Sequence, residues 1–285
     1  DPGSRDVSVT PDGKLALVRR DGSSEVTVVD LEADKRSAVT LSGPVTDLDL
    51  SPDGLRAVAV VRDSQEAVIL RLPEVAEDPS ALTVVKVDDA VIGSVAMAAE
   101  AEVAMLYSNA AEQYRITRLE YSTEPPAYRT MKLHAPVLGV FVSRDGTGAI
   151  LLHDAEALDG GASIPGAFGV LRMAPELPAR LQATLAPPTA VAIAPDGQHA
   201  VVAEKDDSRK IYGAWLVRMP TQQVDRYELA SPPLAVGVLG DVKRAFVAQK
   251  HPEGRLTFVD LDTGLARTLT GFELGARVVD GSQAQ

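Results

Sequence analysis

The stretch Leu48-Asp49-Leu50-Ser51-Pro52-Asp53-Gly54 decides the fold, because its pattern returns at Val191-Ala192-Ile193-Ala194-Pro195-Asp196-Gly197. An acidic residue marks the same turn six times along the chain. We call these anchors, and they are Asp12, Asp53, Glu100, Asp145, Asp196 and Asp241. Their spacings are 41, 47, 45, 51 and 45 residues. A period in the forties is typical of propellers and of helical arrays.

The residues around each anchor distinguish strands from helices. Three and five residues before every anchor the side chain is apolar, as with Leu50 and Leu48, and the residue between them varies. This is the period-two pattern of a strand. Four residues after every anchor stands an alanine: Ala16, Ala57, Ala104, Ala149, Ala200 and Ala245. We therefore predict that each anchor is a hairpin turn, often with glycine at positive φ.

The second half of each repeat contains two further predicted strands, and no helical periodicity is present. Four-stranded units bury both faces only when they stack on their neighbours. We predict an all-β fold, a β-propeller of four-stranded antiparallel blades in a single domain over residues 1–285. The predicted blades span approximately residues 4–43, 44–89, 90–135, 136–187, 188–231 and 232–271. Six blades is our prediction; the alternative is seven, with the last incomplete, because the C-terminal tail 272–285 contains a degenerate copy of the turn at Asp280.

The two quoted stretches resemble the repeats of bacterial WD40-like propellers of the TolB and YVTN types, over nearly the whole chain. The Gly-His and Trp-Asp signature of WD40 repeats is missing. The resemblance implies a binding or scaffold protein of the bacterial cell envelope, although some relatives are lactonases or peptidase-associated domains. It implies a periplasmic, outer-membrane-associated or secreted protein. Asp1 in place of an initiator methionine favours a processed protein, or a blade array cut from a longer polypeptide.

Composition limits the chemistry. The 285 residues include no cysteine, which excludes disulfides, zinc–thiolate sites and thiol nucleophiles. Acidic residues number 40 against 28 basic ones, so the net charge is −12. This balance speaks against nucleic-acid binding and favours a protein partner with a basic patch. No apolar run approaches the roughly 18–20 residues of a membrane span. We predict no catalytic residue, metal or cofactor, since no motif for one is present.

Candidate binding residues lie where the second strand of each repeat ends. Propeller geometry places these ends, and the connections between blades, on one face around the channel mouth. The anchor turns lie on the other face, where the acidic residues cap their own turns. The residues at the second-strand ends break the repeat and bring charge to the rim: Arg20, Arg62, Asp63, Asn109, His153, Asp154, Glu204, Lys205, Lys250 and His251. Simple solvation of strand ends explains the same polarity, so both interpretations stay open.

Two functions follow from this reading. The first is a non-catalytic scaffold or protein-interaction module that uses the rim loops, with a small-molecule ligand as a further option. The long segment from Asp154 to Pro165 is a candidate contact loop. The second is a hydrolase or lactonase at the channel mouth, which requires His153, Glu204 and His251 to converge. We also expect Ala200 and Phe246 to be buried between blades.

Overall fold

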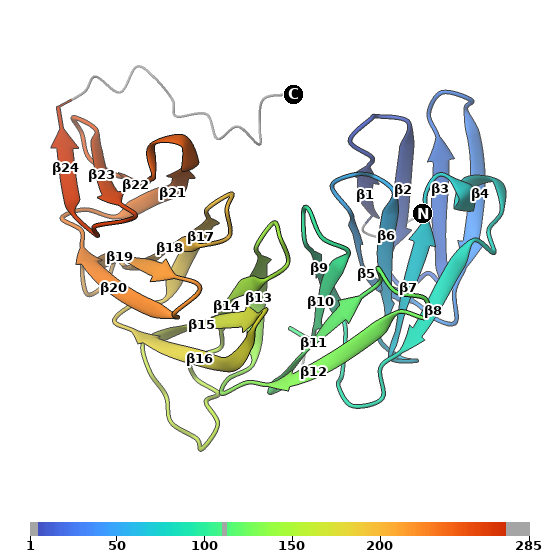
Figure 1. Cartoon of the computed structure of the whole chain (residues 1–285), viewed down its shortest axis with the longest axis horizontal. Helices are drawn as coiled ribbons and strands as arrows, with labels where there is room; N and C mark the ends of the chain where they lie inside the picture. Colours follow the sequence, from blue (N-terminus) through green and yellow to red (C-terminus); the bar gives the residue numbers. More distant parts are fainter. Residues whose placement is uncertain (1–4, 110–112, 272–285) are drawn as a thin grey trace. The chain divides into compact units, whose positions relative to one another are not determined.

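The computed structural model describes residues 5–109 and 113–271. These residues form six antiparallel sheets of four strands each, and the strands of every sheet follow one another in chain order (Figure 1). The predicted all-β fold and the six blades are confirmed. The degenerate turn at Asp280 lies outside the described residues.

Each blade consists of four consecutive strands. The first two blades contain β1 (Arg5–Val9), β2 (Leu15–Arg20), β3 (Glu25–Asp30), β4 (Lys35–Thr40), β5 (Val45–Leu50), β6 (Arg56–Val61), β7 (Glu66–Arg71) and β8 (Leu82–Lys86). The third and fourth contain β9 (Ser94–Met97), β10 (Val103–Tyr107), β11 (Arg115–Glu120), β12 (Ala127–Lys132), β13 (Val137–Val142), β14 (Gly148–His153), β15 (Gly166–Met173) and β16 (Glu176–Thr184). The fifth and sixth contain β17 (Pro188–Ile193), β18 (His199–Asp206), β19 (Ile211–Arg218), β20 (Gln223–Glu228), β21 (Pro233–Leu239), β22 (Arg244–Gln249), β23 (Arg255–Asp260) and β24 (Ala266–Thr270).

Two short helical segments, α1 (Glu74–Glu77) and η1 (Gly240–Val242), interrupt the described strands. No helix in the described ranges is long and apolar enough to cross a membrane. The chain divides into two compact units, residues 1–182 and 183–285. The first unit holds blades one to three and most of blade four, and the second holds blades five and six. The single domain therefore stays a prediction.

The anchor turns form as the sequence predicts. The Asp53 carboxylate accepts hydrogen bonds from the Ser51 hydroxyl at 2.6 Å and from the Leu55 N–H at 2.9 Å. Gly54 adopts φ +72°, which a residue without Cβ tolerates. Burial would raise the pKa of Asp53, but these hydrogen bonds outweigh it and hold the pKa below its ordinary value. Asp12 and Asp145 cap their turns in the same way.

The second strand contributes two neighbouring columns of residues to the core of the blades. The six alanines that follow the anchors are all buried. The next column is also buried except at Phe246, which is half-buried, so the expectation of full burial there is wrong. Phe246 pairs with Gly237 and Phe258 on the sheet face that points away from the fifth blade. Its neighbours Ala245 and Val247 face the opposite way, into the cluster shared with blade five.

Candidate functional site

A residue at or near the end of the second strand is buried in five of the six blades. We call this end of a blade, where the second strand stops, its rim end. Eight residues after the anchors stand Arg20, Val61, Ser108, His153, Glu204 and Gln249. All are buried except Arg20, which is half-buried. Three of the predicted binding residues, Arg20, His153 and Glu204, stand in this column, which we call the inward column, and two of them, His153 and Glu204, are buried.

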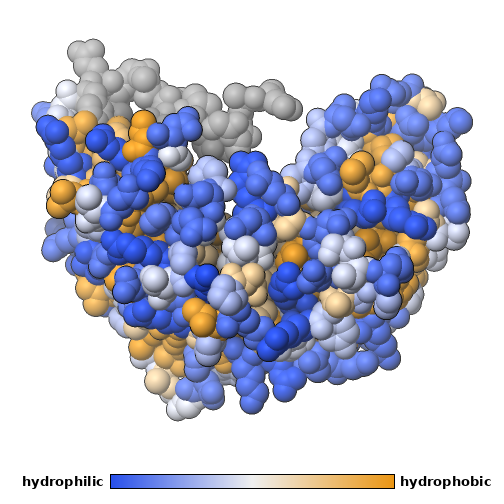
Figure 2. Space-filling view, viewed as in Figure 1, coloured by the Kyte–Doolittle hydropathy of each residue, from blue (hydrophilic) through white to orange (hydrophobic). Residues whose placement is uncertain are grey.

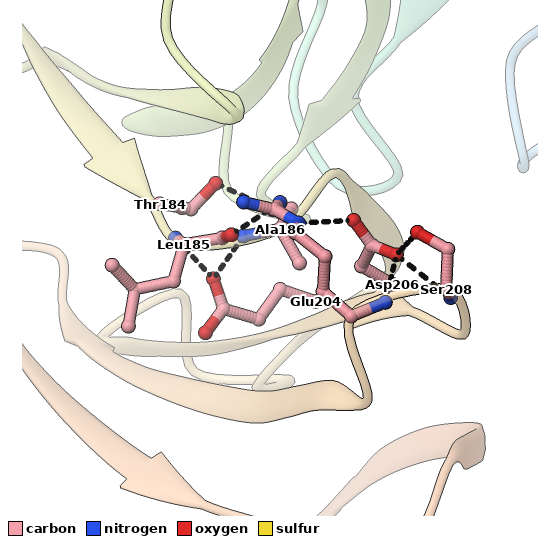
Figure 3. Close-up of polar contacts among 7 residues, drawn as sticks. Thr184, Leu185, Ala186, Glu204, Asp206 and Ser208 are labelled. Carbon is pink, nitrogen blue, oxygen red and sulfur yellow. Dashed lines mark hydrogen bonds and ion pairs between the residues drawn. The ribbon is translucent and has the colours of Figure 1, made fainter.

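Glu204 holds the connection between the fourth and fifth blades (Figure 3). Its fully buried carboxylate accepts hydrogen bonds from the Leu185 N–H at 3.0 Å and the Ala186 N–H at 3.4 Å. The other oxygen accepts from Arg226 Nε at 2.6 Å. Gly213 lies opposite Glu204 in the sheet, and a Cβ there would collide with the carboxylate. Glu204 is therefore satisfied inside the protein, which makes it a structural residue.

The loop after β18 reinforces the same connection. Arg209 donates to the Leu185 carbonyl at 2.8 Å and to the Asp206 carboxylate at 2.6 Å. The Ser208 hydroxyl also donates to Asp206 at 2.6 Å (Figure 3). These hydrogen bonds hold the pKa of Asp206 far below its ordinary value. The Ser208 hydroxyl has the largest effect, and the Arg209 N–H and guanidinium come next.

His153 and Gln249 have the same task in their own blades. The Nδ1 atom of His153 lies 3.1 Å from the Pro136 carbonyl oxygen, in the connection before β13. Burial lowers the pKa of His153, so the imidazole is neutral. The Gln249 side chain bonds the Ser231 hydroxyl at 3.2 Å and the Thr257 hydroxyl at 2.7 Å. Sequence reasoning missed Gln249.

Two predicted residues, from the rim ends of the second and third blades, contact the start of β9. The Arg62 guanidinium lies against Gly93, so closely that no Cβ would fit there. Asn109 accepts a hydrogen bond from the Ser94 hydroxyl at 3.4 Å. Arg62 comes from the second blade and Asn109 from the third, and each contacts one of the two neighbouring residues at the start of β9. Asp63 is exposed next to Arg62.

A cavity of about 500 Å³ lies along the connection that leads to the start of β9. Its lining includes Gln65, Lys86, Asp88, Asp89 and Arg115, and we call it the rim pocket. Its walls are fixed: Gln65 Oε1 accepts from the Ile92 N–H at 3.0 Å, and Asp89 accepts from the Thr130 hydroxyl at 2.7 Å. Arg115 donates to the Asp89 carbonyl.

Sequence reasoning missed the residues that line the rim pocket. A signal for it existed, because the connection 87–93 has seven residues while the other described connections between blades have three or four. Extra length at one connection of a repeat often marks a functional loop.

The remaining predicted residues are spread over other blades. Arg20 ends β2 of the first blade, and Asp154 caps the N–H of Glu156 at 3.0 Å. In the second unit, Lys205 pairs with Asp207 at 2.9 Å, Lys250 is exposed, and His251 accepts from the Glu253 N–H at 3.3 Å. Within residues 5–109 and 113–271, no three His, Asp or Glu side chains are grouped so that they could hold a metal. With His153 and Glu204 buried and bonded to backbone groups, neither presents a free acid or base to a substrate.

The segment from Asp154 to Pro165 is tied to the third blade. The Tyr114 hydroxyl donates to the Ala157 carbonyl at 3.1 Å, and the Asp159 N–H donates to the His134 carbonyl at 2.8 Å. Hydrogen bonds to Tyr114 and His134 therefore hold this loop against the rim end of the third blade.

The sequence matches no protein-family model and no curated protein. Three solved structures are similar in fold. A chain of Kuenenia stuttgartiensis hydrazine synthase has a TM-score of 0.54 at 16% identity, over 90% of this chain and 76% of that chain. A chain of the mitotic checkpoint complex has a TM-score of 0.55 at 13% identity, over 93% and 76%. The β-propeller domain of Myceliophteria thermophila Cps50 (Swd1) has a TM-score of 0.50 at 11% identity, over 93% and 86%. These likenesses support the β-propeller fold, and at such identities they carry no function with them.

Proposed function

We propose that the protein is a non-catalytic interaction module that binds a polypeptide partner at the rim ends of its second and third blades. The observation that carries the proposal is that Arg62 and Asn109, from adjacent blades, contact the neighbouring residues Gly93 and Ser94, directly after the segment that lines the rim pocket. Fixed walls favour recognition, because little conformational freedom is lost when a partner binds. The repeat's resemblance to envelope propellers supports a place in the bacterial cell envelope or outside the cell.

Charge favours a basic partner. The support comes from the net charge of −12 on the whole chain, since at the rim pocket the exposed Asp88 and Asp89 are matched by Lys86 and Arg115. Hydrophilic side chains cover most of the visible surface, with apolar ones in small patches between them (Figure 2). Contacts between charged side chains of the protein and its partner speed their association and fix the partner's orientation. These contacts weaken as the salt concentration increases.

Affinity capture with matched variants tests the proposal. The rim variant is Arg62→Ala/Asp63→Ala/Asn109→Ala, which leaves the buried His153 and Glu204 intact. The control is Lys14→Ala/Glu32→Ala. These two exposed residues of the first blade lie at the end opposite to the rim, with Lys14 Nζ 3.8 Å from Glu32 Oε2. Both variants therefore remove one positive and one negative charge. We expect a partner that is retained by the wild type and the control but reduced about tenfold or more by the rim variant. Equal recovery of every bound protein by all three would overturn the proposed site.

A further inference from the structure

Three polar side chains at the rim ends of the blades lie against glycines. Two of these pairs lie within single blades, and they are Gly169 with His153 and Gly213 with Glu204. The third pair joins neighbouring blades, because Arg62 follows β6 of the second blade and Gly93 precedes β9 of the third. A Cβ on Gly93 would lie 2.7 Å from the Arg62 Cζ, so only a glycine leaves room for the guanidinium. The third blade therefore shapes the place that Arg62 occupies.

Arg62 differs from the other two side chains because it has no partner inside the protein. His153 and Glu204 bond backbone groups of their own connections. The Arg62 guanidinium, in contrast, makes no hydrogen bond and no ion pair within residues 5–109 and 113–271. Of its nitrogen atoms Nε alone is buried, so the two terminal nitrogens are open to solvent. The protein thus positions a cation and its N–H donors at the rim and supplies no acceptor for them.

The surroundings of Arg62 favour a singly charged anion as the missing acceptor. The next residue, Asp63, is exposed and negative, and the whole chain carries a net charge of −12. A phosphate group carries nearly two negative charges, and proteins recognise it with clusters of arginines. A carboxylate carries one charge, and its two oxygens match the planar fork of a single guanidinium.

We infer that Arg62 determines specificity at the rim by binding one carboxylate of the polypeptide partner through its two terminal nitrogens. This inference rests on the proposed function, whose partner it describes. The net negative charge of the chain attracts a partner that is basic as a whole, and Arg62 then requires one carboxylate at a fixed point of its surface. A polypeptide without that carboxylate would cover the guanidinium and leave it unpaired, which costs free energy and so disfavours the wrong partner.

Titration of the full chain with small probes tests the inference without the partner. Binding is followed by NMR at fixed ionic strength, through the Arg62 Nε–H signal and the backbone N–H signals of residues 93 and 94. The probes are N-acetyl-L-glutamate N-methylamide, with a side-chain carboxylate, N-acetyl-L-alanine, with a chain-terminal carboxylate, and the neutral N-acetyl-L-glutamine N-methylamide. We expect a carboxylate probe to bind about tenfold or more tightly than the glutamine probe, and the tighter of the two identifies the source.

Two results of the titration would overturn the inference. The first is equal binding of all three probes, because the carboxylate would then contribute nothing. The second is inorganic phosphate that binds about tenfold more tightly than either carboxylate probe, which would assign Arg62 to a phosphate group.

Variants locate the binding at the guanidinium. Arg62→Gln should abolish the preference for a carboxylate, and Arg62→Lys, which keeps the charge but not the fork, should weaken it several-fold. Gly93→Ala keeps Arg62 and fills its place. Because the guanidinium is the far end of a flexible side chain and can move aside, this variant should fold and bind the carboxylate probe about tenfold more weakly. The matched control is Arg71→Gln, which removes an exposed positive charge from the opposite end of the same blade and should leave the affinity unchanged.

Wild-type affinity in both Arg62→Gln and Gly93→Ala would overturn the site. The probes and the affinity capture also separate this inference from the proposed function. If the rim variant loses a captured partner but the probes bind equally, the carboxylate is wrong while the rim remains the partner's site. If a carboxylate probe is preferred but no partner is captured, the polypeptide source is wrong, and Arg62 belongs to a site for small carboxylates.

Discussion

Replacing Glu204 by alanine tests whether the inward column holds the connections between blades. The change removes the acceptor of the Leu185 and Ala186 N–H groups and leaves Arg226 without its carboxylate. Breaking a buried pair on one side typically costs about 3–5 kcal/mol. The Arg226 side chain is 23% exposed, so water compensates it in part. We therefore expect the lower end, about 3 kcal/mol of unfolding free energy.

Trp215 makes this measurement specific to the blade concerned. It is the only tryptophan of the chain, it lies in β19, and it pairs directly with Arg226 of β20. Urea unfolding followed by its fluorescence thus reports the sheet that contains Glu204. The control is Glu228→Ala, because Glu228 is exposed and lies opposite Gly213 in the same sheet. A surface change of this kind should stay within about 0.5 kcal/mol.

A conservative variant separates charge from geometry. Glu204→Gln keeps an oxygen that can accept an N–H but loses the charge that Arg226 requires, so we expect a loss of about 1.5–3 kcal/mol. The reasoning would be refuted if Glu204→Ala cost less than about 1 kcal/mol, because the two N–H groups and Arg226 would then be hydrated rather than buried.

Three further changes test the packing and the electrostatics of the fifth blade. Gly213→Ala places a Cβ 2.9 Å from Arg226 Nη2 and against the Glu204 carboxylate, so it should cost about 1–3 kcal/mol in the same urea experiment, and a neutral result would mean that the pair moves aside freely. Ala200→Leu overpacks a fully buried position and should also cost about 1–3 kcal/mol, whereas the exposed Ala235→Leu should be close to neutral. Asp206 has a lowered folded-state pKa, so its charge stabilises the protein above the unfolded-state pKa of about 3.9, and this contribution is lost as pH falls toward the folded-state value. The difference in urea midpoint between wild type and Asp206→Asn should therefore be constant from about pH 5 upward and shrink below about pH 4; a difference that persists unchanged in acid would exclude the charge as its cause.

The blades could be predicted because their signals are local. An anchor such as Asp53 bonds groups two residues away, and Gly54 supplies the positive φ, so the turn is encoded within a few residues. The buried alanine column follows from strand periodicity alone. The half-burial of Phe246 could not be read in this way, because it depends on whether a further sheet covers that face of the sixth blade.

The direction of the strand-end residues could have been predicted, and the sequence reasoning overlooked it. Residues on one sheet face are separated by two, so Glu204 shares its face with the buried Ala200 and Val202. The same parity joins His153 to Ala149 and Leu151. The rim pocket, in contrast, depends on how the connection 87–93 folds against Arg115, which no local pattern encodes.

The two columns at the strand ends differ from the repeat for different reasons. In the inward column, three polar side chains match what their own connections present: His153 faces a carbonyl, Glu204 faces two N–H groups, and Gln249 faces a hydroxyl. Variation there follows the backbone of the connection and carries no information about a partner.

One residue further along, the side chains have the opposite parity. The residues nine positions after the anchors are Asp21, Arg62, Asn109, Asp154, Lys205 and Lys250, and none of them is buried. Because burial does not constrain this outward column, its charges are free to match a partner. Exchanges within it, such as Asn109→Lys at the start of β9, should therefore change binding while leaving the urea midpoint at its wild-type value. In contrast, His153→Glu in the inward column should lower the midpoint, because it sets a carboxylate against the Pro136 carbonyl.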